Sequence, residues 1–460
     1  MTVSFAPASA AAVPVHFCTA ATWEALLGTL PAARDHAKML GFEPKAGRHL
    51  LVPGAGGSLA AVVFALEDAA ARARDPFLPG KLATLLPPGV YAFANAPHDA
   101  ELAALAWLLA SYRFTRYKSE AAAPAQLRAP EGVDPARVIR IAEASALARD
   151  LVNTPANDLG PQALEQAVLA LAEQHGATAS VVRGDDLLAQ NFPLIHAVGR
   201  AAAEPPRLAQ FVWGRSGAPK VTLVGKGVCF DTGGLDIKPS SSMLLMKKDM
   251  GGAAAALALA SMVMAGGLDV RLRVIIPIVE NAISACAFRP GDIFPSRKGL
   301  SVEIGNTDAE GRLILADALA LADEEKPEML LDFATLTGAA RIALGPDLPP
   351  FYTMDETLAA DIARHARATY DPVWRLPLWE PYDSMIDGRI SDLNSAPGSS
   401  FAGSITAALF LRRFVEHAKA WVHFDIYAWN PTAKPGRPEG GECQAARLLF
   451  ALLEERYGGK

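Results

Sequence analysis

The sequence predicts a two-domain α/β protein. A smaller N-terminal α/β domain is joined by a linker helix to a larger C-terminal α/β domain with a mixed, largely parallel central sheet. Three observations predict this. The 460 residues suffice for two domains and a substantial core. Residues 121–134 are rich in Ala and Pro without apolar periodicity, as in a linker. Beyond them, apolar strand-like runs alternate with Ala-rich helical runs. We place the N-terminal domain and linker at residues 1–134 and the C-terminal domain at residues 135–460.

The N-terminal domain contains two recognisable strands and a helix. Residues 49–66, HLLVPGAGGSLAAVVFAL, predict two strands joined by a Gly-rich hairpin turn. The GAGG within them lacks the lysine and following hydroxyl residue of a phosphate-binding loop, so no nucleotide site is predicted there. Residues 99–114 are apolar at helical spacing and predict a helix.

The C-terminal domain begins with a predicted helix over residues 135–152, ended by NTPAN. Five apolar runs predict strands, at residues 211–213, 221–224, 272–279, 329–333 and 421–427. Three Ala-rich runs predict helices, at residues 252–264, 312–324 and 405–417. Functional residues of such sheets gather at the carboxyl ends of strands. Lys226 and residues 335–338 follow two of these strands, so we expect a site there.

Composition narrows the function classes. The formal net charge of −6 argues against binding to a phosphate backbone. The four cysteines have no paired spacing, which is typical of reduced thiols in a cytosol. The first residues lack a basic start and a long apolar run, so no signal peptide is expected. Residues 250–268 carry no charge, but they are mostly Ala and Gly and predict a buried helix rather than a membrane span.

The stretch NTDAEGRL, residues 306–313, holds two carboxylates two residues apart. If Asp308 to Glu310 is extended, both acids point to the same side. Two oxygen donors facing one way make half of a cation cage. The alternative is an acidic surface turn with a local ion pair to Arg312.

A second segment, residues 221–256, could supply the other half of the cage. It places Lys226, Asp231, Lys238 and Asp249 among glycines that let backbone approach an ion closely. Asp249 stands directly before an Ala-rich helical run, where it can cap the helix or bind a cation.

Together the two segments resemble the leucine aminopeptidase family (M17, cytosol or leucyl aminopeptidase), whose members are cytosolic two-metal exopeptidases. VGKG, FDTGG, IKPS, DMGGAA and NTDAEGRL are similar to that family's motifs and stand in the family's order. LVNTPAN, ATLTGA, ADALAL and GSITAALFLRRF continue the likeness, and SYRFTRYK is a weaker match. The resemblance covers about the last two thirds of the chain.

The resemblance implies that the C-terminal domain is a catalytic di-metal peptidase domain. It would hold two divalent metal ions per subunit, Mn²⁺ or Zn²⁺, close enough to share a bridging water. Asp231 and Glu310 would bridge the ions, and Asp308 would complete the tighter site. Lys226 and Asp249 would hold the second ion, together with the free amine of a bound peptide.

Two positive groups remain beside these ligands. Lys238 resembles the family's catalytic lysine, which supports the tetrahedral oxyanion. Arg312 resembles the arginine that holds a bicarbonate, with a plain salt bridge as its alternative. Lys226 can be a ligand only when uncharged, because a lysine with a pKa of about 10.4 has no lone pair at neutral pH. Adjacent dications would favour the neutral amine. The alternative is a structural lysine that neutralises the acids.

Substrate would meet the ATLTG segment. The resemblance implies that Leu336, Thr337 and Gly338 line the cleft. Met246 lies where the family has an apolar wall of the pocket for the first substrate residue, and such a wall favours Leu or Met side chains in the substrate. The alternative is that Met246 is an ordinary core residue. The C-terminal FDIYAWNP and the tail after it differ from the usual family ending. This difference bears on the substrate rim and the oligomer contacts, not on the metal site.

We thus predict a metal-dependent leucyl aminopeptidase that releases N-terminal residues from short peptides by a two-metal bridging-water mechanism. The resemblance also implies a cytoplasmic homohexamer. A two-metal phosphoesterase and a DNA-binding accessory protein stay open as alternatives. The absence of a Lys/Arg-rich run argues against nucleic acid, and we expect no membrane association. HExxH and GxSxG are absent, which argues against zincin and serine-hydrolase chemistry.

Overall fold

The computed structural model describes residues 4–119 and 125–459. The predicted fold class, two α/β domains with a mixed, mostly parallel sheet in the larger one, is confirmed.

The chain divides into two compact units. The first comprises Met1–Ala146 with Thr432–Glu439, and the second Leu147–Pro431 with Gly440–Lys460. The division falls inside one continuous helix, α5 (Pro135–Asn153). The predicted limits of 1–134 and 135–460 therefore stay a prediction.

The first unit is a five-stranded sheet covered by helices on both faces. The strand order is β2-β3-β1-β4-β5, with only the β2–β3 pair antiparallel. The strands are β1 (Val13–Cys18), β2 (His49–Pro53), β3 (Leu59–Ala65), β4 (Gly89–Phe93) and β5 (Ala125–Leu127). The helices are α1 (Trp23–Thr29), α2 (Pro31–Met39), α3 (Leu82–Leu85) and α4 (Ala100–Ala110). One core packs α3 and α4 against the sheet, and another packs α1 and α2 against it. The predicted hairpin over residues 49–66 is confirmed, and the helix predicted over residues 99–114 ends at Ala110.

The predicted linker over residues 121–134 is wrong in its middle. Residues 121–124 lie outside the described residues, but β5 follows them and pairs in parallel with β4. Ala125 and Leu127 are buried, and the Ala125 carbonyl accepts a hydrogen bond from Trp107 Nε1 at 3.0 Å. Three residues are too few for a periodicity to show, so only the sheet edge beside β4 decides that they form a strand.

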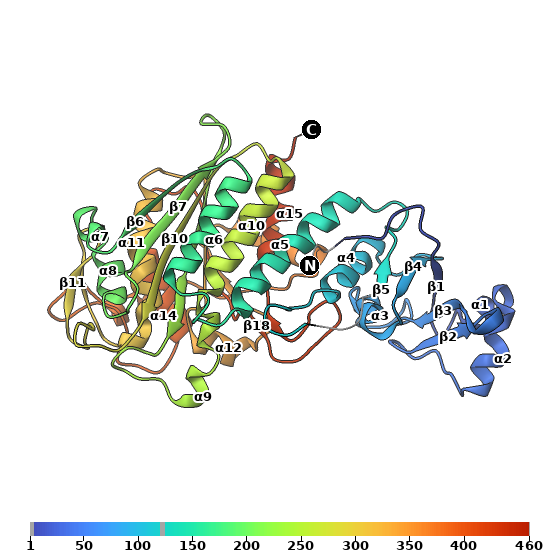
Figure 1. Ribbon diagram of the computed structural model, residues 1–460. Helices are drawn as coiled ribbons and strands as arrows, with labels where there is room; N and C mark the ends of the chain where they lie inside the picture. Colours follow the sequence, from blue (N-terminus) through green and yellow to red (C-terminus); the bar gives the residue numbers. More distant parts are fainter. Residues whose placement is uncertain (1–3, 120–124, 460) are drawn as a thin grey trace. The chain divides into compact units, whose positions relative to one another are not determined.

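The second unit is built on a nine-stranded mixed sheet (Figure 1). The order is β15-β14-β17-β13-β8-β10-β7-β6, and β9 continues alongside β10. The four central strands β17, β13, β8 and β10 are parallel, while β14, β7 and β6 run antiparallel to their inner neighbours. The strands are β6 (Thr178–Arg183), β7 (Arg207–Trp213), β8 (Lys220–Gly225), β9 (Gly227–Asp231), β10 (Arg271–Asn281), β13 (Met329–Ala334), β14 (Pro350–Tyr352), β15 (Trp374–Arg375) and β17 (Trp421–Asp425). All five predicted strands are confirmed.

Helices cover both faces of this sheet. Helices α6 and α10 pack on one face, with α15 behind α10, and α8 and α11 pack on the other, with α14 beside α11 (Figure 1). These helices are α6 (Pro161–Gln174), α8 (Pro193–Gly199), α10 (Gly251–Gly266), α11 (Glu310–Asp323), α14 (Gly403–Arg412) and α15 (Ala446–Tyr457). The shorter or peripheral elements are α7 (Asp186–Ala189), α9 (Ser240–Met243), β11 (Ile293–Pro295), β12 (Ser301–Glu303), α12 (Gly338–Leu344), α13 (Glu356–Ala368), β16 (Leu393–Asn394), β18 (Trp429–Asn430) and β19 (Gly440–Gly441).

Two helix predictions need comment. The helix predicted over residues 405–417 is wrong in its last turn, because the backbone N–H groups of Glu416 and His417 donate to the Asp323 carboxylate instead. The stretch Met246–Gly266 is, within the described ranges, long and apolar enough to span a membrane by length and composition alone. Its apolar window is 83% buried inside the protein, as the prediction of a core helix requires.

Candidate functional site

Lys226 is set at the centre of the sheet by close packing of backbone. It links β8 to β9, and its N–H donates to the Phe333 carbonyl at 2.9 Å. A Cβ on Gly225 would lie 2.6 Å from Ala253 Cα, so only glycine lets α10 approach the strand end. A Cβ on Gly311 would lie 2.6 Å from Lys226 Cε, so a second glycine makes room for the lysine side chain.

Asp249 reaches the same place from the start of α10. It lies in the 3-10 turn η3 (Met246–Met250) that leads directly into the helix. Thr335, just after β13, donates its hydroxyl to Asp249 Oδ1 at 2.7 Å. Burial opposes ionisation of this carboxyl, but Lys226 and Lys248 outweigh it and hold its pKa below the usual value.

The condition considered for Asp308 to Glu310, an extended backbone, is not met. Asp308 lies in a 3-10 turn, η4 (Thr307–Ala309), and Glu310 is the first residue of α11. Asn306 caps the turn by accepting from the Asp308 N–H at 2.7 Å. The helical turn still brings the acids together: carboxylate oxygens of Asp231, Asp308 and Glu310 lie within 4.8 Å of one another.

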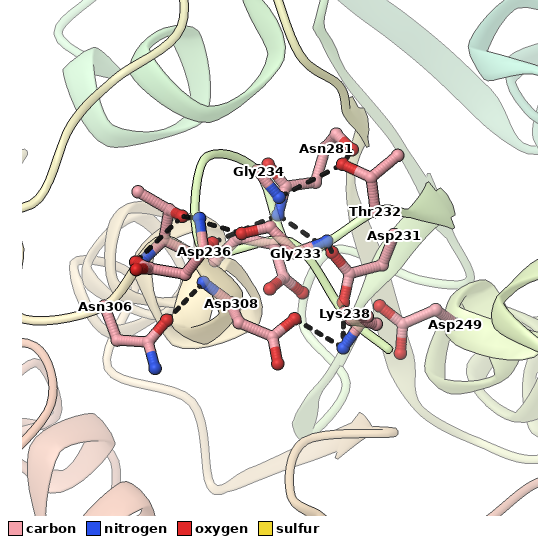
Figure 2. A network of polar contacts seen from close by, with 12 residues as sticks. Asp231, Thr232, Gly233, Gly234, Asp236, Lys238, Asp249, Asn281, Asn306 and Asp308 are labelled. Atoms are coloured by element: carbon pink, nitrogen blue, oxygen red, sulfur yellow. Dashed lines mark hydrogen bonds and ion pairs between the residues drawn. The ribbon is translucent and has the colours of Figure 1, made fainter. Parts of the chain in front are cut away.

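Two lysine ammonium groups lie among these carboxylates. Lys226 Nζ lies 2.7 Å from Asp249 Oδ2 and 2.9 Å from Glu310 Oε1. Lys238 Nζ lies 2.8 Å from Asp231 Oδ2 and also pairs with Asp308 (Figure 2). Four acids thus face two lysines, which leaves an excess of two negative charges when all six are ionised.

The pKa directions follow from this crowding. Burial, then the Asp231 charge, raises the pKa of Asp308 to about 6 and that of Glu310 well above its usual range. Burial alone would lower the pKa of Lys226, but Asp249, Glu310 and Asp231 outweigh it and raise that pKa. The pKa of Lys238 is likewise raised, because Asp231 and Asp308 outweigh burial.

The donor set fits a divalent cation. Glu310 Oε2 is buried and has no hydrogen-bond partner among the described residues. A buried carboxylate oxygen without a partner costs free energy, and a bound cation would remove that cost. The side chains offer mainly carboxylate oxygens, the ligands that hard divalent ions accept.

Side chains that the sequence reasoning missed hold the acids in position. Asn281, at the end of β10, donates to Asp231 Oδ1 at 2.8 Å and to the Thr307 carbonyl at 3.0 Å (Figure 2). Asp425, at the end of β17, accepts from the backbone N–H groups of Leu336 and Thr337 at 3.0 and 3.1 Å. Asn281 and Asp425 are the last residues of β10 and β17, and each lies within two residues of the end of a strand predicted from the sequence, which was a usable signal.

Arg312 lies behind the cluster. It is buried, and its Nη1 donates to the Ser395 carbonyl at 2.5 Å. Its Nε is buried without a hydrogen-bond partner among the described residues. Burial lowers the pKa of Arg312 to about 10, although Glu310 and Asp425 oppose this. One of its donors is therefore free for a small anion.

A cavity of about 440 Å³ opens beside the acids. Every predicted site residue lines it except Glu310 and Arg312, which lie deeper. The predicted residues in its wall are Lys226, Asp231, Lys238, Met246, Asp249, Asp308, Leu336, Thr337 and Gly338. The wall also contains Lys248, Arg341 and Tyr427, which the sequence reasoning did not single out. Burial lowers the pKa of Lys248 to about 8.

Comparison with known proteins agrees with this geometry. A family model described as the cytosol aminopeptidase family, catalytic domain, matches residues 146–450, and one for the M17 aminopeptidase N-terminal domain matches residues 13–130. A probable cytosol aminopeptidase of Syntrophotalea carbinolica is 42% identical over 367 residues, 76% of this chain and 73% of that protein.

Solved structures extend the likeness to nearly the whole chain. The crystal structure of a cytosol aminopeptidase from Coxiella burnetii has a TM-score of 0.93 and 44% identity, covering 97% of this chain and 98% of that one. The bottromycin maturation enzyme BotP in complex with Mn has a TM-score of 0.86 and 31% identity, covering 97% of this chain and 100% of that one. The resemblance seen in the motifs is confirmed: the chain belongs to the cytosol aminopeptidase (M17) family of peptidases, which are hydrolases.

Proposed function

We propose that the protein is a metal-dependent leucyl aminopeptidase that removes N-terminal residues from short peptides by a two-metal bridging-water mechanism. The observation that carries the proposal is the convergence of Lys226, Asp231, Asp249 and Asp308 on one cavity, with Glu310 in contact with Lys226 behind its wall. They come from two separate segments of the chain, and acids with strongly perturbed pKa values beside a cavity favour a functional site.

Asp231 and Glu310 would bridge two divalent ions, with Asp308 on one of them and Lys226 and Asp249 on the other. When bound, the ions would activate a water and polarise the peptide carbonyl. The Mn²⁺ in the BotP complex supports Mn²⁺ as one candidate ion, and Zn²⁺ is the other. Lys226 would have to lose its proton to serve as a ligand, so ion binding should release a proton at this position.

The remaining charged residues would act on the peptide. Lys238 borders the cavity and would support the oxyanion of the tetrahedral intermediate. Arg312, with its unpaired Nε, would hold a bicarbonate that accepts a proton from the attacking water. The backbone of Leu336, Thr337 and Gly338, held by Asp425, would bind the peptide, and Met246 would contact a Leu- or Met-like first side chain.

The family resemblance further supports a cytoplasmic homohexamer acting on peptides. The net charge of −6 and the absence of a Lys/Arg-rich run argue against a role for nucleic acid. Size-exclusion chromatography with light scattering would measure the assembly.

The function itself is tested by stripping the purified protein with chelator and adding back Mn²⁺ or Zn²⁺. Hydrolysis of Leu-p-nitroanilide should vanish and return, with about two ions per chain by elemental analysis. Hydrolysis of p-nitrophenyl phosphate in place of the anilide would favour the phosphoesterase alternative. Full activity after the metal is removed would end the proposal.

A further inference from the structure

Two cations in the cavity wall flank one aromatic ring. Lys248 Nζ lies 4.6 Å from the centre of the Tyr427 ring, and the Arg341 guanidinium carbon lies 5.4 Å from it. All three residues line the cavity that holds the acid cluster. The backbone that carries the ring is held by Gln444, whose Oε1 accepts from the N–H groups of Tyr427 and Ala428 at 3.0 and 2.9 Å.

Neither Lys248 nor Arg341 has an acidic partner among the residues that the structure describes. The side chains of Lys248 and Arg341 make no hydrogen bond or ion pair with any residue in the described part of the chain. Lys248 is nevertheless buried, with 6% of its surface exposed. Lys226 and Lys238 in the same cavity each contact two carboxylates, so the wall near Tyr427 differs from the wall near the acids.

The nearby carboxylates are already engaged. Asp249 pairs with Lys226 and accepts from Thr335. Asp425 accepts from the N–H and the hydroxyl of Thr337 and from the hydroxyl of Ser404. Divalent ions on the acids would leave this end of the cavity still more positive. A buried ammonium without a counter-ion is costly, and a ligand that brings a negative group removes that cost.

We propose that Lys248 and Arg341 form a subsite for a carboxylate of the peptide substrate, and so determine specificity. The proposal rests on the function proposed above and names its substrate class, peptides that carry a carboxylate within reach of the first-residue pocket. Met246 and Leu336 supply apolar contact next to the two cations. A glutamyl side chain has about the length of methionine and ends in the required charge. A free C-terminal carboxylate of a di- or tripeptide has the same chemistry.

Substrate pairs that differ only in this charge test the proposal and separate its two sources. With Mn²⁺-loaded protein, Glu-p-nitroanilide is compared with Gln-p-nitroanilide, and Leu-Leu with Leu-Leu-amide. We expect the charged member of at least one pair to have a kcat/KM about tenfold higher or more, since a charge-assisted hydrogen bond is worth more than a neutral one. The glutamyl pair reports a side-chain carboxylate and the dipeptide pair a terminal one.

The variants are Lys248→Met and Arg341→Gln, with Arg367→Gln as matched control. Arg367 is also an exposed arginine without a partner among the described residues, but it lies on α13 outside this cavity. Arg341→Gln should remove most of the charge preference and leave kcat/KM for Leu-p-nitroanilide within about threefold. Lys248→Met should also remove most of the charge preference, and it is judged by the ratio of kcat/KM within each substrate pair, because Lys248 also stabilises the charge of the neighbouring Asp249. Arg367→Gln should change neither the charge preference nor kcat/KM for Leu-p-nitroanilide. A preference that persists in both variants, or no preference in either pair, would overturn the proposal.

Binding measured without turnover separates failure of the subsite from failure of the proposed function. Calorimetric titration of the protein with L-glutamate, L-glutamine and Leu-Leu should show the same dependence on Lys248. Charge-selective binding without peptide hydrolysis would refute the aminopeptidase function and keep the subsite. Hydrolysis of Leu-p-nitroanilide without any charge selectivity would refute the subsite and keep the function.

Discussion

Replacing Gly311 by alanine should displace Lys226 without removing any charge or any proposed ligand. Gly311 is the second residue of α11, and a Cβ there would lie 2.6 Å from Cε and 2.8 Å from Nζ of Lys226. Carbon atoms in contact lie about 3.5–4.0 Å apart, so the lysine must move by about 1 Å. Its Nζ now lies 2.7 Å from Asp249 and 2.9 Å from Glu310, and the shift would disturb both contacts.

The expected loss of activity in Gly311→Ala is large, whereas the expected loss of folding stability is small. Inserting a methyl group into a filled core costs about 1–3 kcal/mol, and the higher helix propensity of alanine offsets about 1 kcal/mol of that. Unfolding free energy should therefore fall by about 2 kcal/mol at most, and the protein should stay folded. A misplacement of about 1 Å near reacting atoms can cost about a hundredfold in rate, so we expect a fall of that order in kcat/KM.

The assay is hydrolysis of Leu-p-nitroanilide over a Mn²⁺ titration, with urea unfolding of the same preparations. Gly28→Ala is the matched control, because Gly28 is also helical and a Cβ there meets nothing within 4 Å. That control should keep full activity and gain about 0.5–1 kcal/mol of stability. Full activity and unchanged Mn²⁺ affinity in Gly311→Ala would refute the idea that the position of Lys226 is needed.

Three other substitutions test the site and the core. Glu310→Gln should abolish metal binding, measured by elemental analysis. The metal-free variant should be as stable in urea as the metal-free wild-type protein. The reason is that burial, and then Asp231, hold the pKa of the Glu310 carboxyl well above its usual range, so ionising this carboxyl costs free energy in the folded protein. Lys238→Ala should keep the metal and lose about 10²-fold or more in kcat; loss of the ions would mean that the two lysines are assigned the wrong way round. Asp332→Asn should lower the unfolding free energy by about 3–5 kcal/mol at about pH 6, because it breaks the buried His423 Nδ1–Asp332 Oδ1 contact of 2.5 Å. Burial lowers the pKa of His423, but Asp332 outweighs burial and the pKa is raised. The ion pair therefore contributes its full stabilisation below about pH 6.5, the unfolded pKa of histidine, and this stabilisation is lost as the pH rises through the raised pKa of the folded state. The wild-type advantage should thus shrink as the pH is raised into the alkaline range, and a constant difference would contradict this account.

Some predictions needed only local sequence. The apolar runs that became β8, β10 and β13 are nearly continuous, as in strands buried on both faces, and the Ala-rich run that became α10 has high helix propensity. Where the pattern was too short or too mixed, it failed. The three residues of β5 carry no period, and the acids of residues 306–313 are compatible with a strand or a helical turn.

By itself, the sequence determined the alternating α/β organisation and the family, and it singled out four acids and two lysines as site candidates, because these depend on residue type and on order along the chain. Only the tertiary structure decided which distant groups meet. The pairing of β9 with β10 puts Asn281 opposite Asp231, fifty positions earlier. The turn after β17 brings Tyr427 beside Lys248 and Arg341. Such contacts follow from strand order and from packing of helices on the sheet, which no local periodicity encodes.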